Sequence, residues 1–383
     1  MEFKLKDLAI LKNGKIVKPT DQDEIPVFGS NGIIGYTGKP LFNSKMIIIG
    51  RVGANCGSVH YYEGKVWLSD NTIGVEAKKN VNTYYLYYLL KYMQLHRYAG
   101  GSAQPLLNQK TLKDLNINIL PINYQNIIGY VLKLIDKKIE INQKIIENLE
   151  DLSQTLFKRW FIDFEFPDEN GDPYKSSGGE MVDSELGEIP KEWSIQTLND
   201  ISESYNTKRK PLSKLEREKV TSIYPYYGAT KIIDYVDDYL FDGKFILVGE
   251  DGTVQTEEGH PFVQYVWGKF WVSNHAHILK GNNLSDETLM LILNNIDIEP
   301  YITGAVQPKI SKKNLNGIKV IIGTKLIYEK FDQYSDIYYK KIREISEEIK
   351  NLIELRDTLL PKLMSGELEI PDDIEVNEDE LSI

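Results

Sequence analysis

The sequence contains a single cysteine, Cys56, among its 383 residues. One cysteine excludes an internal disulfide framework and cannot by itself form a thiolate metal site. No apolar run approaches the roughly 20 residues of a membrane-spanning helix. The segment from Met1 to Asp7 alternates charged and apolar residues and lacks the apolar core of a signal peptide. We therefore expect a cytoplasmic protein that does not enter a membrane.

Motifs that would identify an enzyme are also scarce. The segment 32–40 misses the spacing of a phosphate-binding loop by one residue, and a proline stands where the Mg²⁺-binding hydroxyl belongs. Glu63 and Lys65 have the spacing of one nuclease motif, but no Pro-Asp pair precedes them and a hairpin turn is expected there. His275 and His277 share one strand face, yet the other histidines form no ligand pattern, which favours two ordinary polar contacts. These absences predict a chain without catalytic residues, metal or cofactor.

The negative net charge of the chain does not exclude binding to nucleic acid. The total is −11, but the charge is unevenly distributed along the chain. Residues 1–123 carry a net charge of +6, whereas the two short segments 164–192 and 366–383 carry −7 and −8. Without these two segments the remaining chain is slightly basic, so its surfaces can still approach phosphate groups. Nucleic acid therefore remains a possible partner.

The second half of the chain repeats the first at an offset near 200 residues, which predicts two similar globular domains. An apolar strand before a glycine-bracketed turn occurs in both copies, as MIIIGRVG (46–53) and FILVGEDG (245–252). The matches on either side are PVFGSNGIIGY (26–36) with PYYGATKIIDY (225–235), and GGSAQPLLNQKTL (100–112) with TGAVQPKISKKNL (303–315). WLSDNTIGV (67–75) matches WVSNHAHIL (271–279), and the loop between FILVGEDG and WVSNHAHIL holds about five more residues than its counterpart in the first copy.

Each copy ends in a long segment that predicts a helix. Between residues 124–161 and 328–364, Gly129 and Pro361 are the only helix breakers, and apolar residues recur at steps of three and four. This pattern favours two antiparallel coiled-coil helices over the alternative of core helices, and it suggests a rod with a pseudo-twofold axis. The expected seam residues are Ile139, Asn142, Ile146, Leu149 and Leu156 in the first helix, and Ile342, Ile345, Ile349, Leu352 and Leu359 in the second.

These elements combine into an α+β fold with a pseudo-twofold internal repeat. We expect two similar mixed α/β domains at residues 1–123 and 193–326, separated by long antiparallel coiled-coil helices at 124–163 and 327–366. The segment 164–192 is rich in Asp, Gly, Pro and Ser and has little to bury, so we expect an acidic linker there. An acidic tail is expected at 367–383.

Two sequence blocks resemble a known family. SELGEIPKEWSIQTLNDI (184–201) resembles the entry to a target-recognition domain, and LIELRDTLLPKLMSGELEI (352–370) resembles the end of a conserved helix. With the repeated order of globular domain and long helix, the chain is similar to the specificity (S) subunits of Type I DNA restriction-modification systems. The first copy departs from the family pattern, since it begins directly at Phe3 and its helix ends in KRWFIDFEF (158–166).

The resemblance implies a subunit without catalytic activity that binds double-stranded DNA. Each target-recognition domain would recognise one half of a bipartite, asymmetric site. Two methyltransferase subunits would dock on the helices, and restriction (translocase) subunits would join them. S-adenosylmethionine, ATP and Mg²⁺ would belong to those partners and not to this chain. Two alternatives stay open: a coiled-coil structural adaptor that never binds DNA, and a stand-alone nuclease built around Glu63 and Lys65.

Loops held on a scaffold are the natural places for DNA contacts. Arg51 is the best single candidate for a base contact, to guanine, while Glu250 or Asp251 can accept from a cytosine amino group. Because Glu250 stands in the place of Arg51, the two domains should share a backbone and recognise different sequences. Gln104 and Gln307 stand at the same position of the two copies and therefore cannot explain different sequence preferences. They either contact phosphate or only order a loop. The candidate residues are Ser30, Asn31, Arg51, Asn55, Ser102, Gln104, Asn108 and Lys110 in the first copy, and Thr230, Lys231, Glu250, Asp251, Thr303, Gln307, Lys309 and Lys312 in the second.

Overall fold

The computed structural model describes residues 1–101, 105–304 and 306–368. The chain divides into two compact units, and each contains one globular domain with a segment of both long helices. Unit 1 comprises Met1–Gln143 and the described part of Ser346–Ile383, and unit 2 comprises Lys144–Ile345. No helix in the described residues combines the length and apolar character that are required to cross a bilayer.

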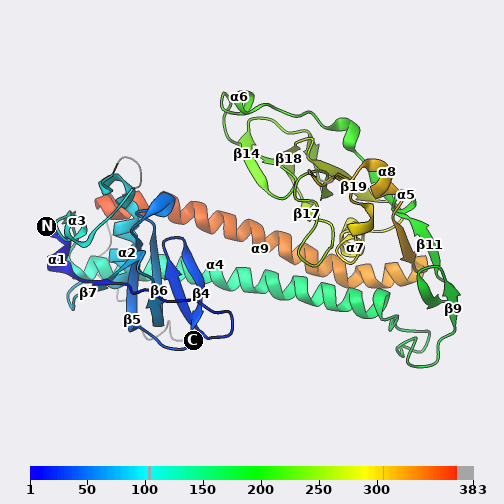
Figure 1. Ribbon diagram of the computed structural model, residues 1–383, viewed down its shortest axis with the longest axis horizontal. Helices are drawn as coiled ribbons and strands as arrows, with labels where there is room; N and C mark the ends of the chain where they lie inside the picture. The colour runs from blue at the N-terminus through cyan, green and yellow to red at the C-terminus, as the bar shows by residue number, and fades with distance from the viewer. Residues whose placement is uncertain (102–104, 305, 369–383) are drawn as a thin grey trace. The chain divides into compact units, whose positions relative to one another are not determined.

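The globular domain of unit 1 is built on a six-stranded sheet with the order β2-β7-β5-β6-β3-β4 (Figure 1). Its centre is β5, whose residues Met46 to Ile49 are completely buried. A separate strand pair, β1 with β8, closes the domain. The elements are β1 (Glu2–Lys4), α1 (Leu5–Leu8), β2 (Ala9–Asn13), β3 (Ile25–Gly29), β4 (Gly32–Thr37), β5 (Phe42–Gly50), η1 (Gly53–Asn55), β6 (Val59–Leu68), β7 (Thr72–Ala77), α2 (Thr83–Tyr92), η2 (Leu95–Tyr98), α3 (Gln109–Lys113) and β8 (Asn116–Asn118).

The globular domain of unit 2 repeats this order in two sheets, β12-β19-β16-β17 and β14-β13-β18-β15. The long strand β6 of the first domain corresponds to two shorter strands here, β17 and β18, and the extra residues predicted for this copy precede β17. The elements are β11 (Ser194–Thr197), α5 (Leu198–Ile201), β12 (Ser202–Ser204), η4 (Asn206–Lys208), α6 (Lys214–Arg217), β13 (Tyr224–Tyr227), β14 (Ile232–Val236), β15 (Phe241–Asp242), β16 (Phe245–Gly249), β17 (Val263–Val266), β18 (Lys269–Val272), β19 (Ala276–Gly281), α7 (Asp286–Leu293), η5 (Glu299–Tyr301), α8 (Lys312–Asn316) and β20 (Lys319–Ile322). The internal repeat and the mixed α/β class are confirmed.

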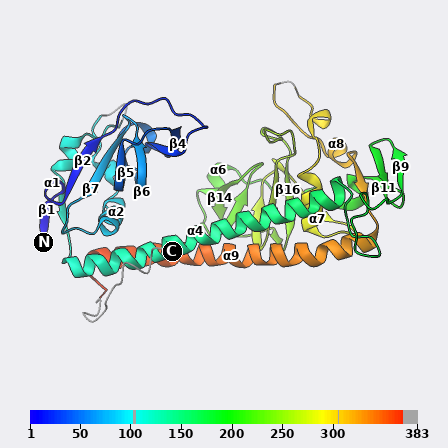
Figure 2. The same cartoon turned by 90° about the horizontal axis from the view of Figure 1, so that it is seen from below.

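The two long helices are α4 (Ile122–Phe157), which continues as a π-helical turn to Ile162, and α9 (Lys325–Ser365). Within each unit their segments lie side by side in opposite directions (Figure 2). In unit 1, Asp136 pairs with Arg356 and Asn142 with Glu348; in unit 2, Phe157 packs on Phe331. As the residue number increases along α4, the number of the contacting residue on α9 decreases. The predicted antiparallel pairing is therefore confirmed.

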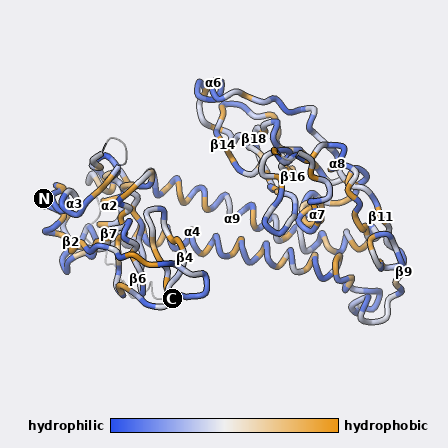
Figure 3. The backbone as a smooth tube through the Cα atoms, in the orientation of Figure 1, coloured by the Kyte–Doolittle hydropathy of each residue, from blue (hydrophilic) through white to orange (hydrophobic). Residues whose placement is uncertain are grey.

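The predicted seam lies at these contacts. Ile139, Asn142, Ile342 and Ile345 are buried, and the other expected seam residues are half-buried. Hydrophobic and hydrophilic residues alternate along both helices at helical spacing (Figure 3). The helices pair with each other and also contribute to the domain cores, since Ile128 and Leu132 of α4 and Leu363 of α9 are buried in the core of unit 1.

Two expectations about local structure were wrong. The segment 164–192 is not a linker with little to bury, because Phe164, Phe166 and Ile189 are buried and join the core around Trp193. Its second part forms the hairpin of β9 (Met181–Ser184) and β10 (Gly187–Pro190). Glu63-Gly64-Lys65 is not a hairpin turn either, since it lies within β6 and pairs with β5. The acidic tail predicted from residue 367 lies outside the described residues beyond residue 368.

Candidate nucleic-acid interface

Three predicted segments of the first domain meet at the end of β5. We call them loop cluster 1: the turn 30–31, the segment 51–58 and the described part of the loop 100–110. The Ser58 hydroxyl donates to the carbonyl of Ser30, and the Ser30 hydroxyl donates to the carbonyl of Asn71 at 2.8 Å. The Leu107 amide donates to the carbonyl of Arg51 at 2.9 Å. Residues that are distant in the sequence thereby form one surface.

The second domain builds loop cluster 2 on the same backbone frame, from residues 228–231, 250–252 and the described part of 303–312. The amide of Arg51 donates to the carbonyl of Asn71 at 3.0 Å, and the amide of Glu250 donates to that of His275 at 2.8 Å. The carbonyl of Glu250 accepts from Ile310 at 2.9 Å, as that of Arg51 does from Leu107. The prediction that Arg51 and Glu250 occupy equivalent backbone positions is therefore confirmed.

The Arg51 side chain has few partners in the part of the chain that the structure describes. Its Nη1 donates to the carbonyl of Asp70 at 3.4 Å, and its buried Nε has no hydrogen-bond partner among residues 1–101, 105–304 and 306–368. Among the residues that the structure describes, no carboxylate lies within ion-pair distance of Arg51. A half-buried guanidinium with unused donors is well suited to bind an acceptor on DNA.

Glu250 has the opposite character, because cations surround it. Its Oε2 lies 2.6 Å from Nη1 of Arg209, and its Oε1 lies 3.3 Å from Nζ of Lys309. Burial alone would raise the pKa of the Glu250 carboxyl, but the hydrogen bond from Arg209 and the nearby charges lower it below its usual value. The adjacent Asp251 accepts from Nδ1 of His275 at 2.6 Å. A cytosine amino group would compete with these internal partners at either carboxylate.

The remaining predicted residues divide into loop supports and exposed groups. Asn108 caps α3 by accepting from the Thr111 amide at 2.9 Å, and the Thr303 hydroxyl donates to the carbonyl of Lys309 at 3.1 Å. Ser30 and Thr230 are half-buried. Ser102 and Gln104 lie outside the described residues. The exposed members are Asn31, Asn55, Lys110, Lys231, Gln307, Lys309 and Lys312.

In each unit, one carboxylate joins the globular domain to the long helices: a half-buried one in unit 1 and a fully buried one in unit 2. In unit 1, Asp136 of α4 accepts from the hydroxyls of Tyr84 and Tyr88, both at 2.6 Å, and pairs with Arg356 of α9 at 2.9 Å. Burial and the neighbouring Asp136 raise the pKa of Tyr87 to about 12, so this tyrosine cluster is neutral at pH 7. The attachment keeps each loop cluster on a rigid support.

In unit 2 the corresponding carboxylate is Glu287 of α7, whose side chain is fully buried. It binds Lys244 at 2.8 Å, the Tyr265 hydroxyl at 2.5 Å and Arg343 of α9 at 2.9 Å. Glu287 is on the globular domain, whereas Asp136 is on the helix. The two attachments are therefore similar in chemistry but reversed in chain position.

A family model described as the Type I restriction modification DNA specificity domain matches residues 1–151 and 190–354. The chain belongs to this family. The Type I restriction enzyme MjaIX specificity subunit of Methanocaldococcus jannaschii is 27% identical to it over 96% of this chain and 93% of that protein. A putative Type I specificity subunit of Haemophilus influenzae is 35% identical over 34% of this chain and 33% of that protein.

A solved structure shows the same fold. The crystal structure of the S subunit of a Type I restriction-modification system from M. genitalium matches with a TM-score of 0.63 and 19% identity, over 98% of this chain and 96% of that chain. The resemblance inferred from residues 184–201 and 352–370 is thus confirmed. The chain is a Type I specificity subunit with a role in recognising DNA sequence.

Two residues that shape loop cluster 2 of this specificity subunit, Arg209 and Asn206, are not indicated by any pattern in the sequence. Arg209 contacts Glu250, and Asn206 holds the edge of β19 by accepting from the Ile278 amide at 2.8 Å. These residues come from the loop after β12, which has no equal-length counterpart in the first copy. Because no spacing rule connects position 209 with position 250, only the folded backbone brings them together.

The histidine pair makes ordinary polar contacts. His275 binds Asp251, and Nε2 of the buried His277 lies 2.8 Å from the carbonyl of Ile310. Burial lowers the pKa of His277, so it stays neutral at pH 7. Within the described ranges, no three His, Cys, Asp or Glu side chains are close enough to hold a metal ion.

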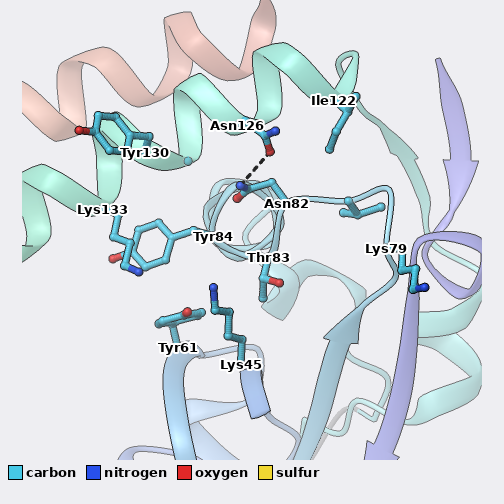
Figure 4. Close-up of a pocket in the computed structure, with 12 residues that line it drawn as sticks. Lys45, Tyr61, Lys79, Asn82, Thr83, Tyr84, Ile122, Asn126, Tyr130 and Lys133 are labelled. Carbon is cyan, nitrogen blue, oxygen red and sulfur yellow. Dashed lines mark hydrogen bonds between the residues drawn. The ribbon is translucent and has the colours of Figure 1, made fainter. Parts of the chain in front are cut away.

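The specificity subunit also has a polar pocket of about 300 Å³ where the sheet of unit 1 meets α4 (Figure 4). Lys45, Lys79 and Lys133 line it, none of its lining residues is acidic, and Asn82 donates to Asn126 across it at 3.1 Å. Lys45 stands near the start of β5, far along the strand from Gly50 and loop cluster 1. Glu63 lies 3.7 Å from Lys45 and 3.6 Å from Lys133, an arrangement typical of structural ion pairs.

Proposed function

We propose that this specificity subunit is non-catalytic and recognises a bipartite, asymmetric double-stranded DNA site, with loop cluster 1 on one half and loop cluster 2 on the other. The observation that carries the proposal is the shared backbone frame at Arg51 and Glu250, which presents opposite charges. A common frame explains how both domains approach DNA in the same way. Different side chains on that frame explain why the two half-sites differ in sequence.

The long helices serve as the docking surface for two methyltransferase subunits. Apolar side chains on their outer faces support this role: Leu134 and Ile141 of α4 in unit 1, and Leu152 (53% exposed) with Ile337 (66% exposed) in unit 2. Leu134 and Ile141 are seven residues apart and therefore lie on one face of α4, where exposed apolar side chains that adjoin one another form the kind of surface that protein partners cover. The methyltransferase subunits supply S-adenosylmethionine chemistry, and restriction subunits that use ATP and Mg²⁺ join the same complex.

The test is to express the chain with and without its methyltransferase partner in a host that lacks adenine methylation, and to sequence the host DNA for modified bases. The expected result is N6-methyladenine at one split motif, present only when both proteins are expressed. The purified chain alone should show neither nuclease nor methyltransferase activity. Activity of the isolated chain, or methylation without a split motif, would overturn the proposal.

A binding measurement separates this function from that of a structural adaptor. The complex should bind DNA carrying the motif with an affinity that falls steeply as salt rises, because each phosphate contact contributes about −0.9 to the logarithmic salt slope. DNA with one half-site scrambled is the matched control and should bind more weakly at every salt concentration. The absence of salt-dependent binding to either DNA would favour the adaptor.

A further inference from the structure

In both domains an arginine side chain donates to a backbone carbonyl at an equivalent position, although the two arginines come from different positions in the chain. In the first domain, Nη1 of Arg51 donates to the carbonyl of Asp70 at 3.4 Å. In the second domain, Nη1 of Arg209 donates to the carbonyl of Asn274 at 3.2 Å. Each of these two acceptor residues directly follows a serine, Ser69 or Ser273. The amide of that serine donates to a carbonyl of the neighbouring strand at 2.9 Å in both domains.

The equivalence of these carbonyls follows from a matched tryptophan. The indole of Trp67 donates to the carbonyl of Lys15 at 2.9 Å, and the indole of Trp271 donates to that of Lys210 at 2.6 Å. Arg209, which precedes Lys210, therefore corresponds to the residue that precedes Lys15. That residue is a glycine.

Gly14 has no room for a side chain. A Cβ placed on Gly14 would lie 1.8 Å from the carbonyl oxygen of Ser69, which is far inside any permitted contact. The first domain therefore cannot reach the shared carbonyl from position 14 on its present backbone, and it does so from position 51. In the second domain, position 209 supplies the guanidinium, and position 250 supplies an acid that holds it.

Glu250 and backbone acceptors fix the Arg209 side chain in one orientation. Nη1 of Arg209 donates to Oε2 of Glu250 at 2.6 Å and to the carbonyl of Ala276 at 2.8 Å, while its Nε donates to the carbonyl of Asn206 at 3.1 Å. Its Nη2 has no partner among the described residues. The guanidinium is thus preorganised, with donors left for one more acceptor.

We propose that Arg209, and not Glu250, is the base-contacting counterpart of Arg51, and that it hydrogen-bonds the acceptor edge of a base, guanine by preference, in the second half-site. This inference rests on the proposed DNA function. It changes the assignment of Glu250, which positions Arg209. At this one contact, both half-sites are read by the same chemical group, delivered from two different loops, and the difference in sequence comes from the other side chains of the two clusters.

The test compares three variants, each co-expressed with the methyltransferase partner and assayed by sequencing methylated host DNA. Arg209→Gln removes the guanidinium but keeps Glu250, whose Oε1 stays paired with Lys309, so a changed motif reports on Arg209 and not on the carboxylate. Arg51→Gln is the corresponding change in the first domain. Arg217→Gln is the matched control, because Arg217 and Asp234 form a similar half-buried pair at 2.8 Å in the same domain but outside loop cluster 2.

The expected result is that the Arg209 variant loses discrimination at one base of one half-site by roughly 5- to 150-fold, the range of a single bidentate base contact. Arg51→Gln should relax the other half-site, and the control should keep the whole motif. An unchanged motif in the folded Arg209 variant, judged by an unchanged co-purification with the methyltransferase, would overturn the inference. The wild-type complex reports separately on the proposed function, since that fails only if no split motif is methylated.

Discussion

The attachment of α9 to the second domain depends on the charge of Glu287. Its carboxylate is fully buried and balances Lys244 and Arg343, so Glu287→Gln keeps the shape of the side chain but leaves two cations without a counter-charge. Removing one partner of a fully buried pair costs about 3 to 5 kcal/mol. Since Lys244 is 35% exposed and Arg343 is 24% exposed and both regain some water contact, we expect a loss of about 2 to 4 kcal/mol in the stability of unit 2.

Thermal unfolding measures this loss. For a folding unit of this size, where 1 kcal/mol shifts the melting temperature by about 2 to 4 °C, the expected decrease is roughly 4 to 16 °C. Glu185→Gln is the matched control in the same unit, because Glu185 pairs with Lys319 on the surface and its loss should cost about 1 kcal/mol or less. Equal shifts for the two variants would refute the argument that burial of Glu287 makes its charge important.

The pH dependence of this difference has a defined sign. Burial alone would raise the pKa of the Glu287 carboxyl, but the hydrogen bonds from Lys244 and Tyr265 lower it below its usual value. A carboxyl with a lowered pKa adds stability that is present above its unfolded pKa, about 4.3, and is lost as pH falls through the folded pKa. The gap in stability between wild type and Glu287→Gln should therefore be full at pH 7 and shrink in acid.

Three further changes test the DNA interface and the helices. Arg51→Ala should relax one half-site and cost about 1 to 3 kcal/mol there, measured from the methylated motif, and an unchanged motif would remove Arg51 from the base contacts. Lys110→Ala should weaken binding to all sequences alike and reduce the salt slope by about 1, whereas a sequence-dependent loss would assign Lys110 to a base. Inserting one heptad after Gln143 and another after Ile345 should preserve the seam but lengthen both helices by about 10 Å, so the original spacer should no longer be methylated. An unchanged spacer would show that the helices do not set the distance between half-sites.

Most of the architecture could be predicted from the sequence, because it depends on local periodicity and on repetition. Apolar spacing near 3.5 identified both long helices and their seam residues, such as Ile139 and Ile342, and the repeat at 46–53 and 245–252 identified the paired domains. Apolar spacing is a property of the chain itself, and two copies of one pattern fold alike. The segment 164–192 escaped this reasoning, since its few aromatic residues gain a hydrophobic environment only when Trp193 and the helices surround them.

The sequence by itself also determined which positions of the two domains correspond, including the exchange of Arg51 for Glu250. Only the tertiary structure decided what those side chains do. Glu250 binds Arg209, which lies 41 residues earlier in the chain. Arg209 in turn donates to the carbonyl of Asn274, the equivalent of the Asp70 carbonyl that accepts from Arg51 in the other domain. Side-chain pairing across loops depends on where the folded backbone places each Cα. No spacing in the sequence encodes that placement, so the chemistry of the interface emerges only after folding.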